Sequence, residues 1–529
     1  SAGAITLDAT TGGIDGAGAL TLNAVGGVTL NNNLTSAGAT IIDADSNADG
    51  TGDFTIVDGA TLTSGGATVS ITAADVLMNT TGAINAGVGA VTLAPASASA
   101  VGLGGTASGA FDISDAELDN ITTTGLLTFG NANATTMTVN GFTYTGTSGL
   151  ALTAIGTGGA INFATGASTT AGALTLSALD SVTVDANVTA SGVISINADS
   201  DAAGTGLFSL SATRTLSSGG NNAITITANK MALAGTSITS GTARTTLLGA
   251  ASAAFDLGSL VDSTAGKVEL SDAELDIITA GVLQINNGGA GAIELTSALT
   301  PLNITTMTLN AAGNVTDSAT GSIAIANLRV QSGATAALDT ATNNVDTISI
   351  DGLGGTTTTY VDADGFTLDA VDGGAGIAAL KVNLTAVGDL IINQAITGDR
   401  GVNITNNGVD ATTTLNAAVR LTASSDRTIN ITTDDLEISG TGSFGTNQLS
   451  GVHTLNINTF TVGQQINFGA ANTAGDTIMD LTNFELGRLN LGSQNLDNIN
   501  IGALRARARL LFPALSPISP GVSIIGLFK

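Results

Sequence analysis

Leu20-Thr-Leu-Asn-Ala-Val-Gly-Gly-Val-Thr-Leu30 alternates apolar with small polar residues, and it returns about 154 residues later as Leu174-Thr-Leu-Ser-Ala-Leu-Asp-Ser-Val-Thr-Val184. Alternation with a period of two is typical of a β-strand that buries one face. The similarity continues at the same offset, because Asp43-Ala-Asp-Ser-Asn-Ala-Asp-Gly-Thr-Gly-Asp-Phe54 matches Asn197-Ala-Asp-Ser-Asp-Ala-Ala-Gly-Thr-Gly-Leu-Phe208. Self-similarity built from short strands predicts an array of stacked units that share one core.

The offset between the two copies changes along the chain. Diverged repeats lie near 20–143 and 174–309, a weaker echo lies near 429–440, and their offsets range from about 144 to about 170 residues. Neighbouring coils of a solenoid contact only each other, so loops of different length can be inserted between them. We therefore expect residues 1–504 to form a β-solenoid.

Composition supports a thin core. The 529 residues include 70 Gly and no Trp or Cys, and only 11% are charged. Val, Ile, Leu, Ala and Thr fill a narrow core without large aromatic side chains, and Gly and Asn accept the backbone angles of tight corners. The predicted fold class is all-β, an elongated parallel β-helix with coils of roughly 20 to 25 residues.

A second repeated phrase interrupts the strand pattern. Ser114-Asp-Ala-Glu-Leu-Asp-Asn-Ile121 reappears as Ser271-Asp-Ala-Glu-Leu-Asp-Ile-Ile278. Ser followed three residues later by Glu has the spacing of a capping box, in which each side chain satisfies a backbone N–H group of a helix start. Each copy predicts one helical turn at a corner of the solenoid.

Charge limits the partners. The formal net charge is −28, and no Lys or Arg precedes Arg214, so the first 213 residues cannot neutralise a phosphate backbone. We therefore expect no nucleic-acid partner, and the acidic balance favours an extracellular or outer-surface location. We also expect no transmembrane segment, since the nearest approach to one, the uncharged stretch Leu510–Phe528, contains three prolines.

The last residues differ from the rest. Residues 505–529 form a basic, proline-rich and apolar tail that follows the repeats. It is predicted either to cap the last coil or to dock on an acidic neighbouring molecule during assembly. The residues assigned to this role are Arg505, Arg507, Arg509, Phe512 and Phe528.

One loop has the residue types of a calcium site. Asp45, Asn47, Asp49 and Asp53 occupy positions 1, 3, 5 and 9 of the Ca²⁺-loop pattern, with Gly at position 6. Position 12 is Ile56 where the pattern requires Glu, and the second repeat copy lacks two of the acids. A weak Ca²⁺ site and a solvated turn both stay open, and no other cofactor is expected.

Three phrases carry a resemblance to a known family. Ser-Asp-Ala-Glu-Leu-Asp-x-Ile-Thr at 114–122 and 271–279, the stretch 82–93 and the stretch 431–438 resemble the repeats of bacterial exoproteins of the filamentous haemagglutinin type. The resemblance implies a right-handed parallel β-helix that is displayed on or shed from a Gram-negative surface. Such a protein acts in adhesion or as a structural fibre. Its expected partners are further copies of itself, joined end to end, or host and cell-surface molecules.

Catalytic residues are scarce. The single histidine, His453, lies in a strand-like phrase and is expected to face solvent or to stand in a ladder of stacked side chains. We expect a non-enzymatic rod, with a polysaccharide-binding or polysaccharide-cleaving β-helix as the alternative.

Overall fold

The computed structural model describes residues 3–8, 13–105, 109–261, 264, 266–286, 289, 291–352, 356–422, 427–446, 453–469, 478–489, 496 and 498–503. The described residues are 54% strand and 4% helix, and their stacked parallel sheets form a β-solenoid of about 19 turns. The predicted fold class is confirmed.

The solenoid divides into two compact units. Unit 1 comprises Ser1–Ala253 and Val261–Leu283, and unit 2 comprises Ala254–Leu260 and Gln284–Lys529.

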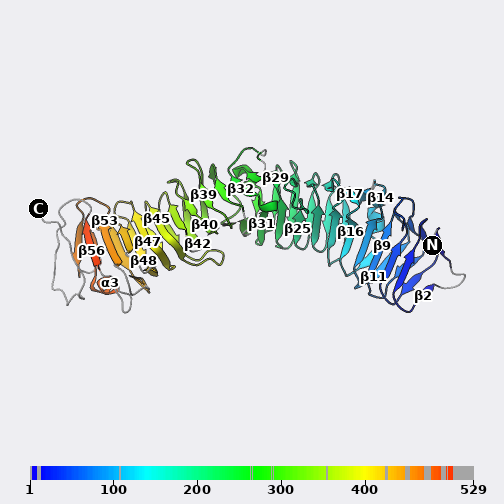
Figure 1. Cartoon of the computed structure of the whole chain (residues 1–529), viewed down its shortest axis with the longest axis horizontal. Coiled ribbons are helices and arrows are strands. Elements are labelled where there is room, and N and C mark those ends of the chain that lie inside the picture. The colour runs from blue at the N-terminus through cyan, green and yellow to red at the C-terminus, as the bar shows by residue number, and fades with distance from the viewer. Residues whose placement is uncertain are drawn as a thin grey trace. The chain divides into compact units, whose positions relative to one another are not determined.

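Unit 1 has short strands stacked on several faces (Figure 1). A four-stranded sheet contains β1 (Ile5–Leu7), β4 (Val28–Leu30), β7 (Phe54–Ile56) and β10 (Val76–Met78). A five-stranded sheet contains β2 (Ile14–Gly16), β5 (Leu34–Ser36), β8 (Thr61–Thr63), β11 (Ala83–Gly87) and β15 (Ile121–Thr123). A longer stack contains β3 (Leu20–Asn23), β6 (Thr40–Asp43), β9 (Val69–Ala73), β12 (Val91–Pro95), β16 (Leu127–Asn131), β19 (Leu150–Ala154), β22 (Leu174–Ala178), β25 (Ile194–Asn197), β28 (Ile224–Ala228) and β31 (Arg244–Gly249).

Two further faces complete the later coils of unit 1. A seven-stranded sheet contains β14 (Phe111–Ile113), β13 (Ser99–Leu103), β17 (Ala134–Val139), β20 (Ala160–Phe163), β23 (Ser181–Val184), β26 (Leu207–Leu210) and β29 (Lys230–Leu233). A six-stranded sheet contains β18 (Phe142–Tyr144), β21 (Ser168–Thr170), β24 (Val188–Ala190), β27 (Thr215–Ser218), β30 (Ser237–Thr239) and β34 (Ile278–Thr279). β33 (Lys267–Leu270) lies beside β29.

The core of unit 1 is made of aliphatic side chains stacked in register. Leu150 pairs with Leu174, Leu174 with Ile194, and Ile194 with Ile224, and all four are buried. The steps between these pairs are unequal, yet the register is kept, so the extra residues are accommodated in the corners. Repeated burial of such side chains, each contributing about 1.5–3 kcal/mol, holds the coils together.

Among the described residues, unit 2 has fewer strands than unit 1, and its strands are longer on average. One sheet contains β32 (Ala254–Leu257), β36 (Ile293–Leu295), β39 (Val315–Asp317), β41 (Ala336–Leu338), β43 (Thr357–Val361), β45 (Ile377–Ala386), β47 (Ile396–Asn406), β50 (Arg427–Thr432), β53 (His453–Thr459) and β56 (Asn498–Ala503), with β49 (Ala418–Leu421) beside β47 and β52 (Ser443–Thr446) beside β49. A second stack contains β37 (Ala298–Leu299), β38 (Thr306–Ala311), β40 (Ser322–Ser332), β42 (Asn344–Gly352), β44 (Phe366–Leu368), β46 (Leu390–Ile392), β48 (Thr412–Leu415) and β51 (Asp435–Ile438). β54 (Gln465–Phe468) pairs with β55 (Ile478–Leu481).

Helices among the described residues are short. They are α1 (Asp115–Leu118), α2 (Asp272–Asp276), α3 (Asn483–Arg488) and the 3₁₀ turn η1 (Ala250–Ser252). α1 and α2 are the two helical turns that the capping-box spacing predicts, and both capping boxes are formed.

Candidate functional site

The glutamate of the first capping box does more than cap a helix. Glu117 Oε2 accepts hydrogen bonds from the backbone N–H of Ser114 at 2.9 Å and from its hydroxyl at 2.8 Å. Its other oxygen, Oε1, accepts the backbone N–H of Met78 at 2.9 Å. Met78 is the last residue of β10, which lies at the end of its four-stranded sheet. Glu117 therefore supplies the acceptor that a further strand would otherwise provide.

The same arrangement recurs at the other two helices. Glu274 accepts the backbone N–H of Leu233, at the end of β29, at 3.0 Å. Glu485 accepts the backbone N–H of Ile438, at the end of β51, at 2.9 Å. A buried N–H without an acceptor costs about 1–3 kcal/mol, so each glutamate lets a sheet end inside the stack without that penalty.

The third copy was missed by sequence reasoning. Thr482-Asn-Phe-Glu485-Leu keeps the glutamate and the leucine of the earlier copies, but Thr replaces Ser as the capping residue and the two positions after it differ. The shared pattern is apolar, acidic, aliphatic, Ser or Thr, any two residues, then Glu-Leu. A search for this pattern would have found all three corners, whereas a search for identity finds two.

Two of these corners also contain a carboxylate with a raised pKa. Asp75 Oδ1 accepts the backbone N–H groups of Val76 and Asp112, both at 2.9 Å, and burial raises the pKa of Asp75 to about 6. Asp435 Oδ1 likewise accepts the backbone N–H of the next residue, Leu436, at 2.9 Å, and burial raises the pKa of Asp435 to about 6. At the α2 corner, Lys230 occupies the equivalent position.

The predicted calcium residues lie in one turn of unit 1. Asp45 is buried, and its carboxylate accepts the backbone N–H groups of Asp49 at 3.2 Å and Gly50 at 2.8 Å. Asp49 accepts from the Asn47 amide at 2.6 Å and from the Thr51 hydroxyl at 2.6 Å, and these hydrogen bonds lower its pKa.

Asp53, the fourth predicted ligand, has a pKa raised by burial and by the nearby Asp45 charge. Within the described residues, no group of three or more His, Cys, Asp or Glu side chains is arranged to hold a metal ion. Calcium binding at this turn stays a prediction.

The second repeat copy shows which part of this turn the fold uses. Asp199, the counterpart of Asp45, is also buried and accepts the backbone N–H of Gly204 at 3.1 Å. Ala48 and Ala202 share the same positive φ of 55°. The repeat thus preserves an aspartate-bridged turn, and the acids at positions 49 and 53 are not required for it.

A ladder of asparagine side chains runs along the outward row of the main sheet of unit 2. Each amide Nδ2 donates to the Oδ1 of the preceding asparagine at 2.7–2.8 Å, and all these side chains are half-buried. The first member donates to the hydroxyl of Thr359 at 3.3 Å. The ladder consists of Asn383, Asn403, Asn430, Asn456 and Asn500.

Sequence reasoning missed this ladder although a signal was present. Each asparagine stands between two aliphatic residues, as in Val402-Asn-Ile404 and Ile499-Asn-Ile501. The separations along the chain are 20, 27, 26 and 44 residues, so no fixed period exposes them. Strand register, and not spacing, aligns them.

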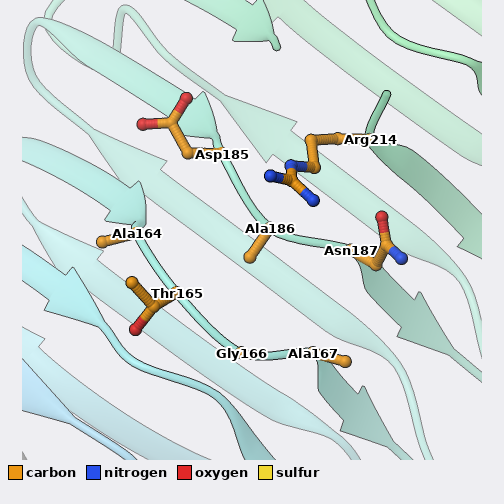
Figure 2. A pocket seen from close by; sticks show the side chains of 8 residues that line it. All are labelled: Ala164, Thr165, Gly166, Ala167, Asp185, Ala186, Asn187 and Arg214. Atoms are coloured by element: carbon orange, nitrogen blue, oxygen red, sulfur yellow. The ribbon is translucent and has the colours of Figure 1, made fainter. Parts of the chain in front are cut away.

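A polar groove crosses three successive corners of unit 1 (Figure 2). The corner between β23 and β24 has three residues, whereas the corners before and after it, 164–167 and 211–214, have four. The short corner is therefore recessed, with buried Ala186 as its floor. The groove has a volume of about 280 Å³ and is lined by Ala164, Thr165, Gly166, Ala167, Asp185, Ala186, Asn187 and Arg214.

Polar groups surround this floor. The Asp185 carboxylate accepts the hydroxyl hydrogen of Ser211 through Oδ1, and Asn187 Oδ1 accepts the backbone N–H of Thr215 at 3.1 Å. Arg214 is exposed, and its guanidinium makes no hydrogen bond or ion pair with any other residue that the structure describes. The groove thus holds one cation and one anion that are not joined to each other.

Of the remaining predicted positions, the structure describes His453 but not the tail residues. His453 is 1% exposed at the start of β53, in register with Arg427, so the expectation that it faces solvent is wrong. The assembly residues Arg505, Arg507, Arg509, Phe512 and Phe528 lie outside the described residues.

No family model, curated protein or solved structure matches this chain. The fold is that of a β-helix repeat protein, which is the part of the haemagglutinin-type resemblance that the structure supports. Among the described residues, no helix combines the length and the apolar character needed to cross a membrane.

Proposed function

We propose that the chain is a non-enzymatic, extracellular β-solenoid of a bacterial cell surface, with a structural and adhesive role. The observation that carries the proposal is that the main interactions of the chain hold the stack of coils together. Stacked aliphatic rows, glutamates that close sheet edges and an asparagine ladder all serve to continue or end a stack of coils. A protein whose role is display over a distance needs these features, and a net charge of −28 helps it stay soluble.

Self-association is part of the proposal. An exposed strand edge is a template for pairing with another chain, so the first and last coils of a solenoid offer a route to end-to-end assembly. The basic tail, with Arg505, Arg507 and Arg509, complements the acidic remainder of a second copy. Host or cell-surface molecules are the other proposed partners.

Negative-stain electron microscopy of the purified chain over a concentration series tests assembly. Fibres of uniform width that lengthen with concentration support it, and discrete particles at every concentration contradict it. A deletion of residues 505–529 that leaves the fibres unchanged would remove the tail from the joint. Cleavage of any polysaccharide in an activity screen would contradict the non-enzymatic role.

A further inference from the structure

The groove over Ala186 is suited to a small ligand by its construction. Its floor is an alanine that is 5% exposed, and glycine and alanine residues of the 164–167 corner form one wall. The other wall is the 211–214 corner, which carries Arg214 (Figure 2). At about 280 Å³ the groove is just below the range of roughly 300–1,000 Å³ that is typical of small-molecule sites. One sugar ring is a ligand of this size class.

The free hydrogen-bonding groups of the groove include both donors and acceptors. Arg214 offers guanidinium N–H donors, and the Asn187 amide nitrogen remains a donor while its oxygen is occupied by Thr215. Asp185 accepts from Ser211 through Oδ1, which leaves Oδ2 as an acceptor. A hydroxyl group donates one hydrogen bond and accepts others, so neighbouring hydroxyls on one ligand can satisfy both kinds of group at once.

Charge selects a neutral ligand. Asp185 and Arg214 balance each other within the groove, so neither an anion nor a cation gains a net attraction there. An anion also meets the field of a chain with net charge −28 that has no Lys or Arg before Arg214. The same field attracts a cation, and within the groove the Arg214 guanidinium is the group that opposes one.

Arg214 differs from an arginine that the fold uses structurally. Arg329 in unit 2 donates to the Asp351 carboxylate at 2.8 and 2.6 Å and to the backbone carbonyl of Asp372 at 2.6 Å. Arg214 has no such partners among the described residues, so its head group is available without breaking any contact of the fold.

From this geometry we propose that the groove binds a neutral saccharide unit, held by Asp185, Asn187 and Arg214 over the Ala186 floor. The inference rests on the proposed adhesive function and deepens it, because it assigns one class of surface ligand to one place on the solenoid. Without an aromatic stacking platform in the lining, a single site binds weakly, with dissociation constants on the order of 1 mM.

Saturation-transfer NMR with the full chain tests the site. The probes are glucose, galactose, mannose and N-acetylglucosamine, each alone, with glucuronate and inorganic phosphate as anionic comparisons. We expect at least one neutral sugar to bind and the Arg214→Ala variant to bind it at least about tenfold more weakly, since a hydrogen bond from a charged donor is stronger than one between neutral groups.

Arg400→Ala is the matched control. Arg400 is also exposed and its side chain has no partner among the described residues. It lies in β47 of unit 2, so its loss removes the same charge outside the groove. Sugar binding should be unchanged in this variant, and both variants should keep the wild-type melting temperature.

Three results would overturn the proposal. They are the absence of binding by all four neutral sugars, equal binding by Arg214→Ala and the wild type, and binding of glucuronate or phosphate in preference to the neutral sugars. A negative sugar-binding result does not affect the electron microscopy test of assembly. Conversely, sugar binding by a chain found only inside cells would support the groove and contradict the surface role.

Discussion

Removing the Glu117 side chain should open the last strand of its sheet. In Glu117→Ala the backbone N–H groups of Met78 and Ser114 both lose their carboxylate acceptor. Met78 is 5% exposed, so water does not readily replace that acceptor at its N–H group. The loss of a buried acceptor costs about 1–3 kcal/mol and the loss of the capping interaction about 1 kcal/mol, which gives about 2–4 kcal/mol in total.

Amide hydrogen exchange at Asn79 measures this effect locally. The Asn79 N–H donates to the carbonyl of Ile56 at 3.0 Å, and the substitution does not remove that acceptor. Its exchange therefore reports opening of β10, and it should accelerate by roughly 30- to 1,000-fold if opening becomes 2–4 kcal/mol easier.

Asp119→Ala is the matched control for this experiment. Asp119 is exposed at the end of the same helical turn, and its side chain makes no hydrogen bond with another described residue, so the variant removes one carboxylate without changing the sheet edge. Unchanged exchange at Asn79 in Glu117→Ala, or equal acceleration in both variants, would refute the idea that Glu117 closes the sheet.

Three further predictions follow from the same structure. Because burial raises the folded-state pKa of Asp75 to about 6 from an ordinary 3.8, its contribution to stability is present below pH 3.8 and is lost as pH rises through 6. The chain should therefore melt at a higher temperature at pH 5 than at pH 7, and Asp75→Asn should raise the melting temperature at pH 7; a lower melting temperature at pH 5 would contradict this. Asn430→Ala interrupts the asparagine ladder and should cost about 1–2 kcal/mol in urea unfolding, whereas Asn458→Ala, an outward asparagine outside the ladder, should cost less than half of that. Calorimetric titration with Ca²⁺ should give heat only at millimolar concentrations, lost in Asp45→Ala, and no heat at all would remove the calcium site.

Strand alternation and the drifting repeat were sufficient to predict the fold. The first strands of Leu20–Leu30 and of its counterpart at 174–184, β3 and β22, lie in one stack of unit 1, and extra residues between coils are absorbed in corners. The two recognised capping boxes are also formed as expected. These features are local, so the sequence around each position is enough to determine them.

The features that were missed depend on register between distant residues. Glu117 and Met78 lie 39 residues apart, and Asn456 and Asn500 lie 44 apart. Nothing local to either residue reveals such a partner. The groove over Ala186 is of the same kind, because it arises from a difference of one residue between neighbouring corners.

Immunogold electron microscopy on unpermeabilised cells that naturally produce the chain tests the proposed role most directly. An antibody raised against the purified chain should label the outside of intact cells, and the label should be absent from cells that lack the gene. Labelling that appears only after permeabilisation would contradict a surface role for this solenoid.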